Sequence, residues 1–256
     1  MTSANSLFPA YKLDLQPRIA RNYADWSLDE ETYAKHLKSR LAVGVSDVDV
    51  WNFLEYIAVV AANGINYLGI RAAGFRDFKN RGSGAGYPEF DVKSMDDVLS
   101  EMVVNFTAHA SDDDAFYSII GKEALDRSLR NFFLLFPYLY DDFMAEDGYA
   151  DKPPAINLDD LDKDKKYAHL RQRETFGVSR YDAIRFDLYF AEVLGTGFKI
   201  LSEISHGHPV DLTYEDWQAQ LLSISDNFFA YHRGDTDRID PEIIDLFVQR
   251  FPSFWD

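Results

Sequence analysis

The sequence contains no cysteine. This absence excludes disulfide bonds, thiolate metal ligands and cysteine nucleophiles, and it is compatible with a reducing compartment. Basic residues are also few, since 26 Lys and Arg stand against 43 Asp and Glu, for a formal net charge of −17. Proteins that bind nucleic-acid phosphates or anionic membranes need clustered cations. We therefore expect no direct nucleic-acid binding, no membrane docking and a cytoplasmic location.

Long uninterrupted apolar runs are missing as well. Residues 1–17 lack the basic-then-apolar layout of a signal peptide. The longest apolar stretch, residues 51–70, is interrupted by polar side chains that include Glu55 and Asn63. These groups would be costly in lipid, so the stretch predicts a buried central helix and no membrane span.

Aromatic residues are abundant, with 20 Phe, 15 Tyr and 4 Trp, and large rings can close a core between few helices. Apolar residues recur every three or four positions after a series of helix-start signals. These signals lie at Ser27, Ser46, Ser94, Ser179, Thr213 and Asp240, and a further helix is expected from Lys122. The predicted fold class is all-α, a multi-helix bundle of about six main helices with an aromatic-rich core and little or no strand.

A change in composition divides the chain. Residues 148–175 contain Pro153 and Pro154, then an acidic patch and a basic one, which is typical of a connector. The predicted organisation is an N-terminal helical half (1–147), a connector (148–175) and a C-terminal helical half (176–256), or alternatively one continuous domain. We expect no internal repeat, because the similar segments 105–109 and 227–231 differ in their spacing from the preceding caps.

The C-terminal third carries Thr213-Tyr-Glu-Asp-Trp217, a final amphipathic helix with Leu246-Phe-Val-Gln-Arg-Phe251, and Phe254-Trp-Asp256. This arrangement resembles uncharacterised helical proteins encoded by phages and prophages, which pair a T-x-E-x-W helix start with a final LF-x-x-x-F…LWD pattern. The resemblance covers roughly residues 180–256, and Phe254 stands where the pattern has Leu. It implies a phage-related origin and assigns no chemistry.

One metal site can be suggested from spacing. Glu203 and His206 have the Glu-x-x-His spacing of carboxylate-bridged metal sites in four-helix bundles, and His208 adds a second imidazole. Such a site needs a second Glu-x-x-His, which the sequence lacks. The alternative interpretation is a helix end, where histidines bind the last carbonyl groups.

A basic, glycine-rich stretch could hold a phosphate through Arg76, Lys79 and Arg81. It matches neither the Walker A nor the dinucleotide-binding spacing, so an interhelical loop is the favoured interpretation. The sequence also lacks a G-x-S-x-G nucleophile motif. We assign no catalytic residue and expect no cofactor, which favours a non-enzymatic protein while leaving the question of activity open.

The segment 139–164 is strongly acidic, with nine acidic residues and two lysines. Its predicted partner-binding residues are Asp141, Asp142, Glu146, Asp147, Asp159, Asp160 and Asp162. The leading hypothesis is a non-enzymatic protein that binds a protein partner, a basic one by charge complementarity. Two alternatives stay open, namely a metal- or small-molecule-binding bundle and an acidic nucleic-acid mimic or inhibitor that acts through residues 139–164.

Overall fold

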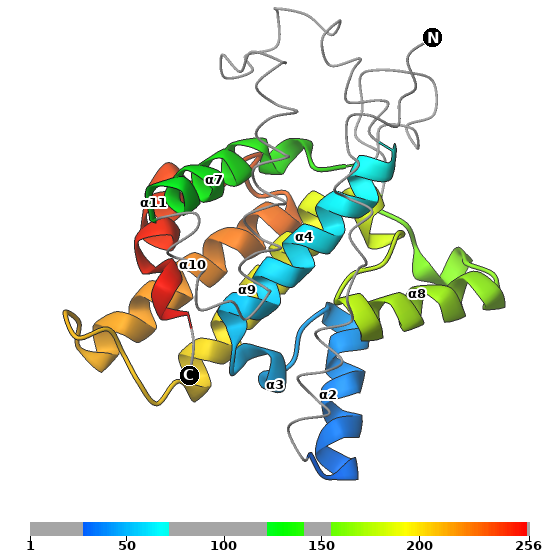
Figure 1. Cartoon of the computed structure of the whole chain (residues 1–256), viewed down its shortest axis with the longest axis horizontal. Helices are drawn as coiled ribbons and strands as arrows, with labels where there is room; N and C mark the ends of the chain where they lie inside the picture. The colour runs from blue at the N-terminus through cyan, green and yellow to red at the C-terminus, as the bar shows by residue number, and fades with distance from the viewer. Residues whose placement is uncertain (1–27, 72–121, 141–154, 255–256) are drawn as a thin grey trace, which may run out of the picture.

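The computed structural model describes residues 28–71, 122–140 and 155–254. These residues form eight α-helices and four short 3₁₀ turns, and no strand occurs among them (Figure 1). The all-α prediction is confirmed for the described residues.

The α-helices are α2 (Glu30–Val43), α3 (Asp47–Val50), α4 (Phe53–Arg71), α7 (Lys122–Leu135), α8 (Lys163–Phe176), α9 (Phe186–Ile204), α10 (Tyr214–Arg233) and α11 (Pro241–Arg250). The 3₁₀ turns are η4 (Phe136–Tyr138), η6 (Leu158–Asp160), η7 (Asp182–Arg185) and η8 (Phe251–Ser253).

Several helices begin at the predicted caps, because a side-chain oxygen there accepts a hydrogen bond from an otherwise unpaired N–H of the first turn. Ser46 forms a complete capping box with Asp49, and Thr213 accepts from the N–H of Asp216. Asp240 caps α11, with Pro241 at the first helical position as predicted. The cap of α2 is Asp29, two residues beyond the predicted Ser27. The helix expected after Ser94 lies outside the described residues.

Three boundaries differ from the sequence predictions. The helix expected to run on from Ser46 is divided at Trp51 and Asn52 into α3 and α4. Ser179 accepts from the N–H of Asp182 at the start of the 3₁₀ turn η7, and the long helix α9 begins only at Phe186. The predicted connector 148–175 is wrong from residue 163 onward, because Lys163–Phe176 is helix α8 with Asp162 as its cap. Dense charge suggested a linker here, but charged residues with a good cap also form an exposed helix.

The centre of the molecule is the contact between α4 and α9, which lie beside each other in Figure 1. Glycine allows this close approach, because a Cβ on Gly64 would lie 2.1 Å from the ring of Phe186. A Cβ on Gly197 would likewise lie 2.1 Å from the ring of Phe53. Both rings are fully buried, so neither can move aside without opening the core. Close packing against Phe53 therefore accounts for Gly197 within α9.

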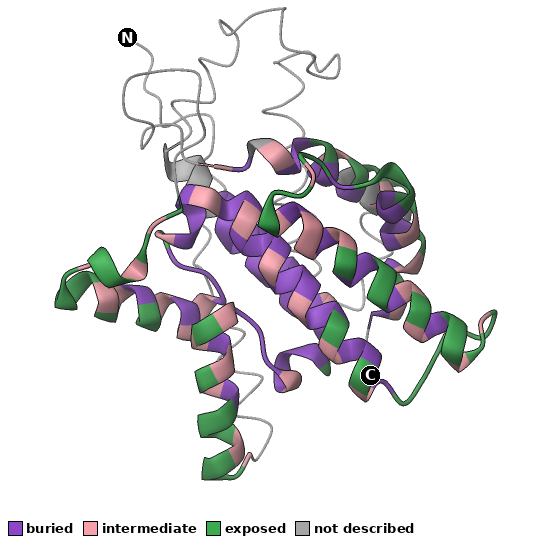
Figure 2. Ribbon diagram, turned by 180° about the vertical axis from the view of Figure 1, so that it is seen from behind, coloured by how far each residue is buried: buried purple, intermediate pink, exposed green. Residues whose placement is uncertain are grey.

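Aromatic side chains fill the space between α7, α9, α10, α11 and η8. The ring centroids of Phe198 and Phe254 are 4.7 Å apart at an edge-to-face angle of 75°, and those of Phe133 and Phe247 are 4.8 Å apart at 73°. Trp217 stacks on Phe254 with centroids 6.1 Å apart. These geometries suit the ring quadrupoles and add to the stabilisation from buried area. Helices α2 and α8 project away from this core, and each has only two buried residues (Figure 2).

Replacing Trp217 with alanine tests the aromatic core. The side chain is only 1% exposed, so truncation leaves a cavity, and we expect a loss of about 3–5 kcal/mol in the free energy of unfolding. Chemical denaturation of the variant measures this loss. The matched control is Leu222→Ala on the same helix, where the side chain is 42% exposed and the loss should be far smaller. Equal stability of the two variants would contradict this description of the core.

Candidate functional site

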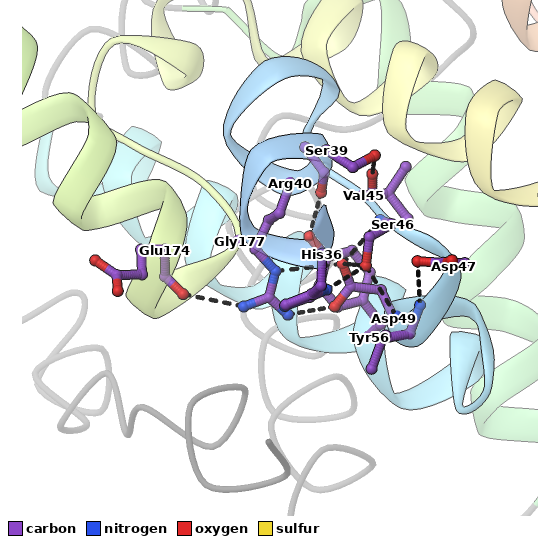
Figure 3. Close-up of polar contacts among 12 residues, drawn as sticks. His36, Ser39, Arg40, Val45, Ser46, Asp47, Asp49, Tyr56, Glu174 and Gly177 are labelled. Carbon is purple, nitrogen blue, oxygen red and sulfur yellow. Dashed lines mark hydrogen bonds and ion pairs between the residues drawn. The ribbon is translucent and has the colours of Figure 1, made fainter. Parts of the chain in front are cut away.

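A buried polar cluster lies where α2 meets the body of the protein (Figure 3). We call it the N-terminal cluster, and it comprises His36, Arg40, Ser46, Asp49 and Tyr56. The guanidinium of Arg40 donates to both carboxylate oxygens of Asp49, with Nε 3.2 Å from Oδ2. Nδ1 of His36 contacts the hydroxyl of Ser46, which also lies 3.1 Å from Oδ2 of Asp49. The hydroxyl of Tyr56 donates to the carbonyl of the αL residue that ends α2.

A second cluster lies where α8 meets the body. This C-terminal cluster comprises His169, Arg173, Ser179, Asp182 and Tyr189. The guanidinium of Arg173 donates to both carboxylate oxygens of Asp182, at 2.9 Å and 2.7 Å. Nδ1 of His169 is 2.7 Å from the hydroxyl of Ser179, and the hydroxyl of Tyr189 donates to the carbonyl of the αL residue that ends α8.

The two clusters have the same residue types at the same spacings. Residues 36–56 and 169–189 share the pattern H-L-x-x-R-x-x-x-G-V-S-x-x-D-x-x-x-F-x-x-Y. The expectation that the sequence contains no internal repeat is therefore wrong. The similar segments 105–109 and 227–231 are short and aromatic, whereas the repeat is carried by polar residues at helix ends. Its signal was present in the sequence as two H-L-x-x-R…G-V-S segments.

Each arginine also reaches across to the other copy of the repeat. Nη1 of Arg40 donates to the carbonyl of Glu174 at 3.0 Å, near the end of α8. Nη1 of Arg173 donates to the carbonyls of Leu41 and Ala42 at 2.8 Å and 3.0 Å, near the end of α2. The last carbonyl groups of a helix lack intrahelical hydrogen-bond donors and carry the negative end of the helix dipole. A buried guanidinium there supplies the missing donors and also interacts favourably with the dipole.

The geometry of these clusters differs from that of a nucleophilic triad. In a triad a carboxylate orients the histidine and the histidine activates the serine. Here Asp49 and Asp182 hold the arginines, and both carboxylates accept from the N–H of the serine that begins the next turn. The two serines are fully buried and accept from N–H groups in that turn. The clusters therefore have the arrangement of helix caps and ion pairs.

Burial disfavours the charged form of both histidines and lowers the pKa of each. Desolvation lowers the pKa of His36 to about 4, with a further contribution from Arg40 and an opposing one from Asp47. Desolvation also lowers the pKa of His169, with Arg173 adding to the effect and Asp182 opposing it. Nε2 of His169 is buried without a hydrogen-bond partner among the described residues, so an imidazolium there would leave an unsatisfied N–H.

The predicted metal ligands lie at the end of α9. Glu203, His206 and His208 are all exposed there, and Nδ1 of His208 is 3.0 Å from the carbonyl of Pro209. In the part of the chain that the structure describes, no three His, Asp or Glu side chains form a group that could hold a metal ion. Glu203 lies in the last turn of α9, and His206 and His208 follow its end at Ile204.

The other predicted residues lie partly outside the described ranges. This holds for the phosphate-binding candidates Arg76, Lys79 and Arg81, and for the partner-binding candidates Asp141, Asp142, Glu146 and Asp147. The remaining candidates, Asp159, Asp160 and Asp162, are exposed around the start of α8. Asp159 pairs with Lys166 at 3.1 Å, and Asp162 caps α8 and pairs with Lys165.

Comparison of the chain with protein-family models, curated proteins and solved structures gave no match. Within residues 28–71, 122–140 and 155–254, no helix has the length and apolar character needed to cross a membrane.

Replacing Arg40 with leucine tests the N-terminal cluster. The change leaves the carboxylate of Asp49 buried without its partner, and we expect a loss of about 3–5 kcal/mol in the free energy of unfolding. Denaturant titration measures it. Lys35→Ala removes the exposed ion pair with Asp47 and serves as the control, with little expected change. A loss in the control as large as that in the arginine variant would show that burial of the pair does not matter.

Stability should also decrease in mild acid. The folded-state pKa of His36 is about 4 and the ordinary value is 6.5, so the unfolded chain binds more protons between these values. The contribution of His36 to the free energy of unfolding should therefore be constant above about pH 7 and fall as the pH drops below about 6.5. Thermal melts at pH 7.5, 6.0 and 5.0 measure this, with the exposed His208→Ala as a control that keeps the same profile. A melting temperature that is flat down to pH 5 would contradict the neutral buried histidines.

Proposed function

We propose that the protein acts without catalysis, by binding a protein partner through the outer face of α8 and the acidic turn that precedes it. One observation carries the proposal. Tyr167 is 66% exposed and Leu170 is 39% exposed on a helix that projects from the body (Figures 1 and 2). Aromatic anchors of this kind contribute much of the binding energy in protein interfaces.

The repeat supports the proposal because it supplies a comparison helix. The inner faces of α2 and α8 carry the same His and Arg, which hold the helices to the body. The outer faces differ, since Glu30 and Ala34 of α2 correspond to Lys163 and Tyr167 of α8. Holding the helix in place does not explain Tyr167, which has Ala34 at the equivalent position of α2, and recognition of a partner does.

The charges around α8 define the chemistry of the partner. Asp159 and Asp160 are exposed in the turn before the helix, whereas Asp162 has a structural role as its cap. Residues 155–180 contain five acidic and six basic residues, so this part of the chain has no uniform anionic surface. The partner we propose has an apolar pocket for Tyr167 and Leu170, bordered by basic groups that face Asp159 and Asp160. The net charge of −17 favours the approach of such a basic surface.

Alanine substitution on α8 tests the proposal. Tyr167→Ala with Leu170→Ala should abolish capture of the partner from an extract of the source cell, while the melting temperature stays within about 2 °C because both side chains are exposed. Affinity capture with quantitative mass spectrometry is the measurement. The matched control is Tyr33→Ala on α2, where the side chain is 41% exposed and capture should be unchanged.

Charge variants test the chemistry of the partner separately. Asp159→Lys with Asp160→Lys should weaken capture and reduce its salt dependence. If both α8 variants capture the same proteins as the unmodified chain, the proposed surface is wrong. If capture or activity is instead lost on replacing His206 and His208, the metal-binding alternative takes its place.

A further inference from the structure

Pairs of contacts between the two copies of the repeat are reciprocal. The first pair involves the glycines of the central helices, where Gly64 of α4 receives the ring of Phe186, and Gly197 of α9 receives the ring of Phe53. The two glycines are equivalent in the alignment of the repeats, and so are the two phenylalanines. The glycine of each copy thus contacts the equivalent phenylalanine of the other copy.

The second pair involves main-chain hydrogen bonds at the starts of the central helices. The N–H of Leu54, at the start of α4, donates to the carbonyl of Phe254 at 3.0 Å. The N–H of Asp187, at the start of α9, donates to the carbonyl of Leu139 at 2.8 Å. Phe254 and Leu139 each follow a Phe-Pro-x 3₁₀ turn, η8 and η4. Each copy thus supplies a carbonyl that follows its 3₁₀ turn to a first-turn N–H of the other.

The arginines of the two clusters supply the third pair. Arg40 donates to the carbonyl of Glu174, and Arg173 donates to that of Leu41, which is the position equivalent to Glu174. Reciprocal contacts of this kind are the defining property of an interface between two subunits related by a two-fold axis.

We infer that the chain is a covalently joined pseudo-dimer of two copies of one helical unit. Among the described residues, the N-terminal unit comprises 28–71 and 122–140 and the C-terminal unit comprises 155–254, and the surface of each unit is built to bind the other. A single unit on its own would expose Phe53 or Phe186, an inward-facing arginine and an unpaired helix start. The units therefore fold only as a pair, in one cooperative transition.

Cleavage of the folded full-length chain tests the inference. A protease recognition sequence is inserted within residues 141–154, and the chain is cut after folding. We expect the two fragments to elute together in native size-exclusion chromatography, and to regain the helical circular dichroism signal when mixed after separation in denaturant. Fragments that separate under native conditions, and that each keep the helical signal, would overturn the inference.

Glycine variants give a second readout that does not need cleavage to succeed. Gly64→Ala and Gly197→Ala should each weaken reassociation of the fragments about ten-fold or more, which corresponds to about 1.4 kcal/mol, because each Cβ collides with a ring of the other unit. Gly207→Ala is the control, since a Cβ there meets nothing within 4 Å. In the uncut chain, the two variants should lower the midpoint of a single denaturation transition. Separate transitions for the two units, or equal behaviour of all three variants, would overturn the inference.

Discussion

The structure depends on two buried arginine–aspartate pairs that each serve both units of the chain. Arg40 and Arg173 are held by an aspartate of their own unit and donate to helix-end carbonyls of the other. Burying such charges costs several kcal/mol per ion, so they are retained only where geometry and hydrogen bonding satisfy them. Each guanidinium also lies over a buried tyrosine ring, at 5.2 Å for Tyr56 and 4.7 Å for Tyr189. A slipped pairing of the units would leave these charges unsatisfied, so the pairs specify the arrangement as well as stabilise it.

This arrangement separates the inner helix faces that hold the fold together from the outer face of α8, which we propose binds a partner. Inner residues of α2 and α8 are the same because they contact the same partners in the two units. Outer residues have no such constraint, and those of α8 include an exposed tyrosine where α2 has Ala34, with acidic residues at the helix start. An interaction surface on one arm of a symmetric framework accounts for both observations.

Much of the fold could be predicted from the sequence, because caps and apolar periodicity are local signals. Ser46, Thr213 and Asp240 cap helices as predicted. The apolar residues spaced three or four apart along α10 are buried, namely Trp217, Leu221, Ile224, Phe228 and Tyr231. The polar clusters were missed because their partners come from sequence positions far apart, and a buried Arg looks like any surface Arg in a sequence. Helix α8 was missed for a related reason, since its outer face is charged and only its His and Arg are buried. The repeat could be detected in the sequence, but only the reciprocal contacts of the structure show that the two copies form an interface with each other.

The central claim is that the two units form one cooperative structure, and hydrogen exchange of two main-chain amides tests it most directly. The N–H groups of Leu54 and Asp187 donate across the units. Because breaking either bond requires the units to part, both amides should exchange only through global unfolding, with the same free energy as that measured by denaturant titration. If one of these amides exchanges through a much cheaper local opening while the helices of the other unit stay protected, the units are independent and the account is wrong.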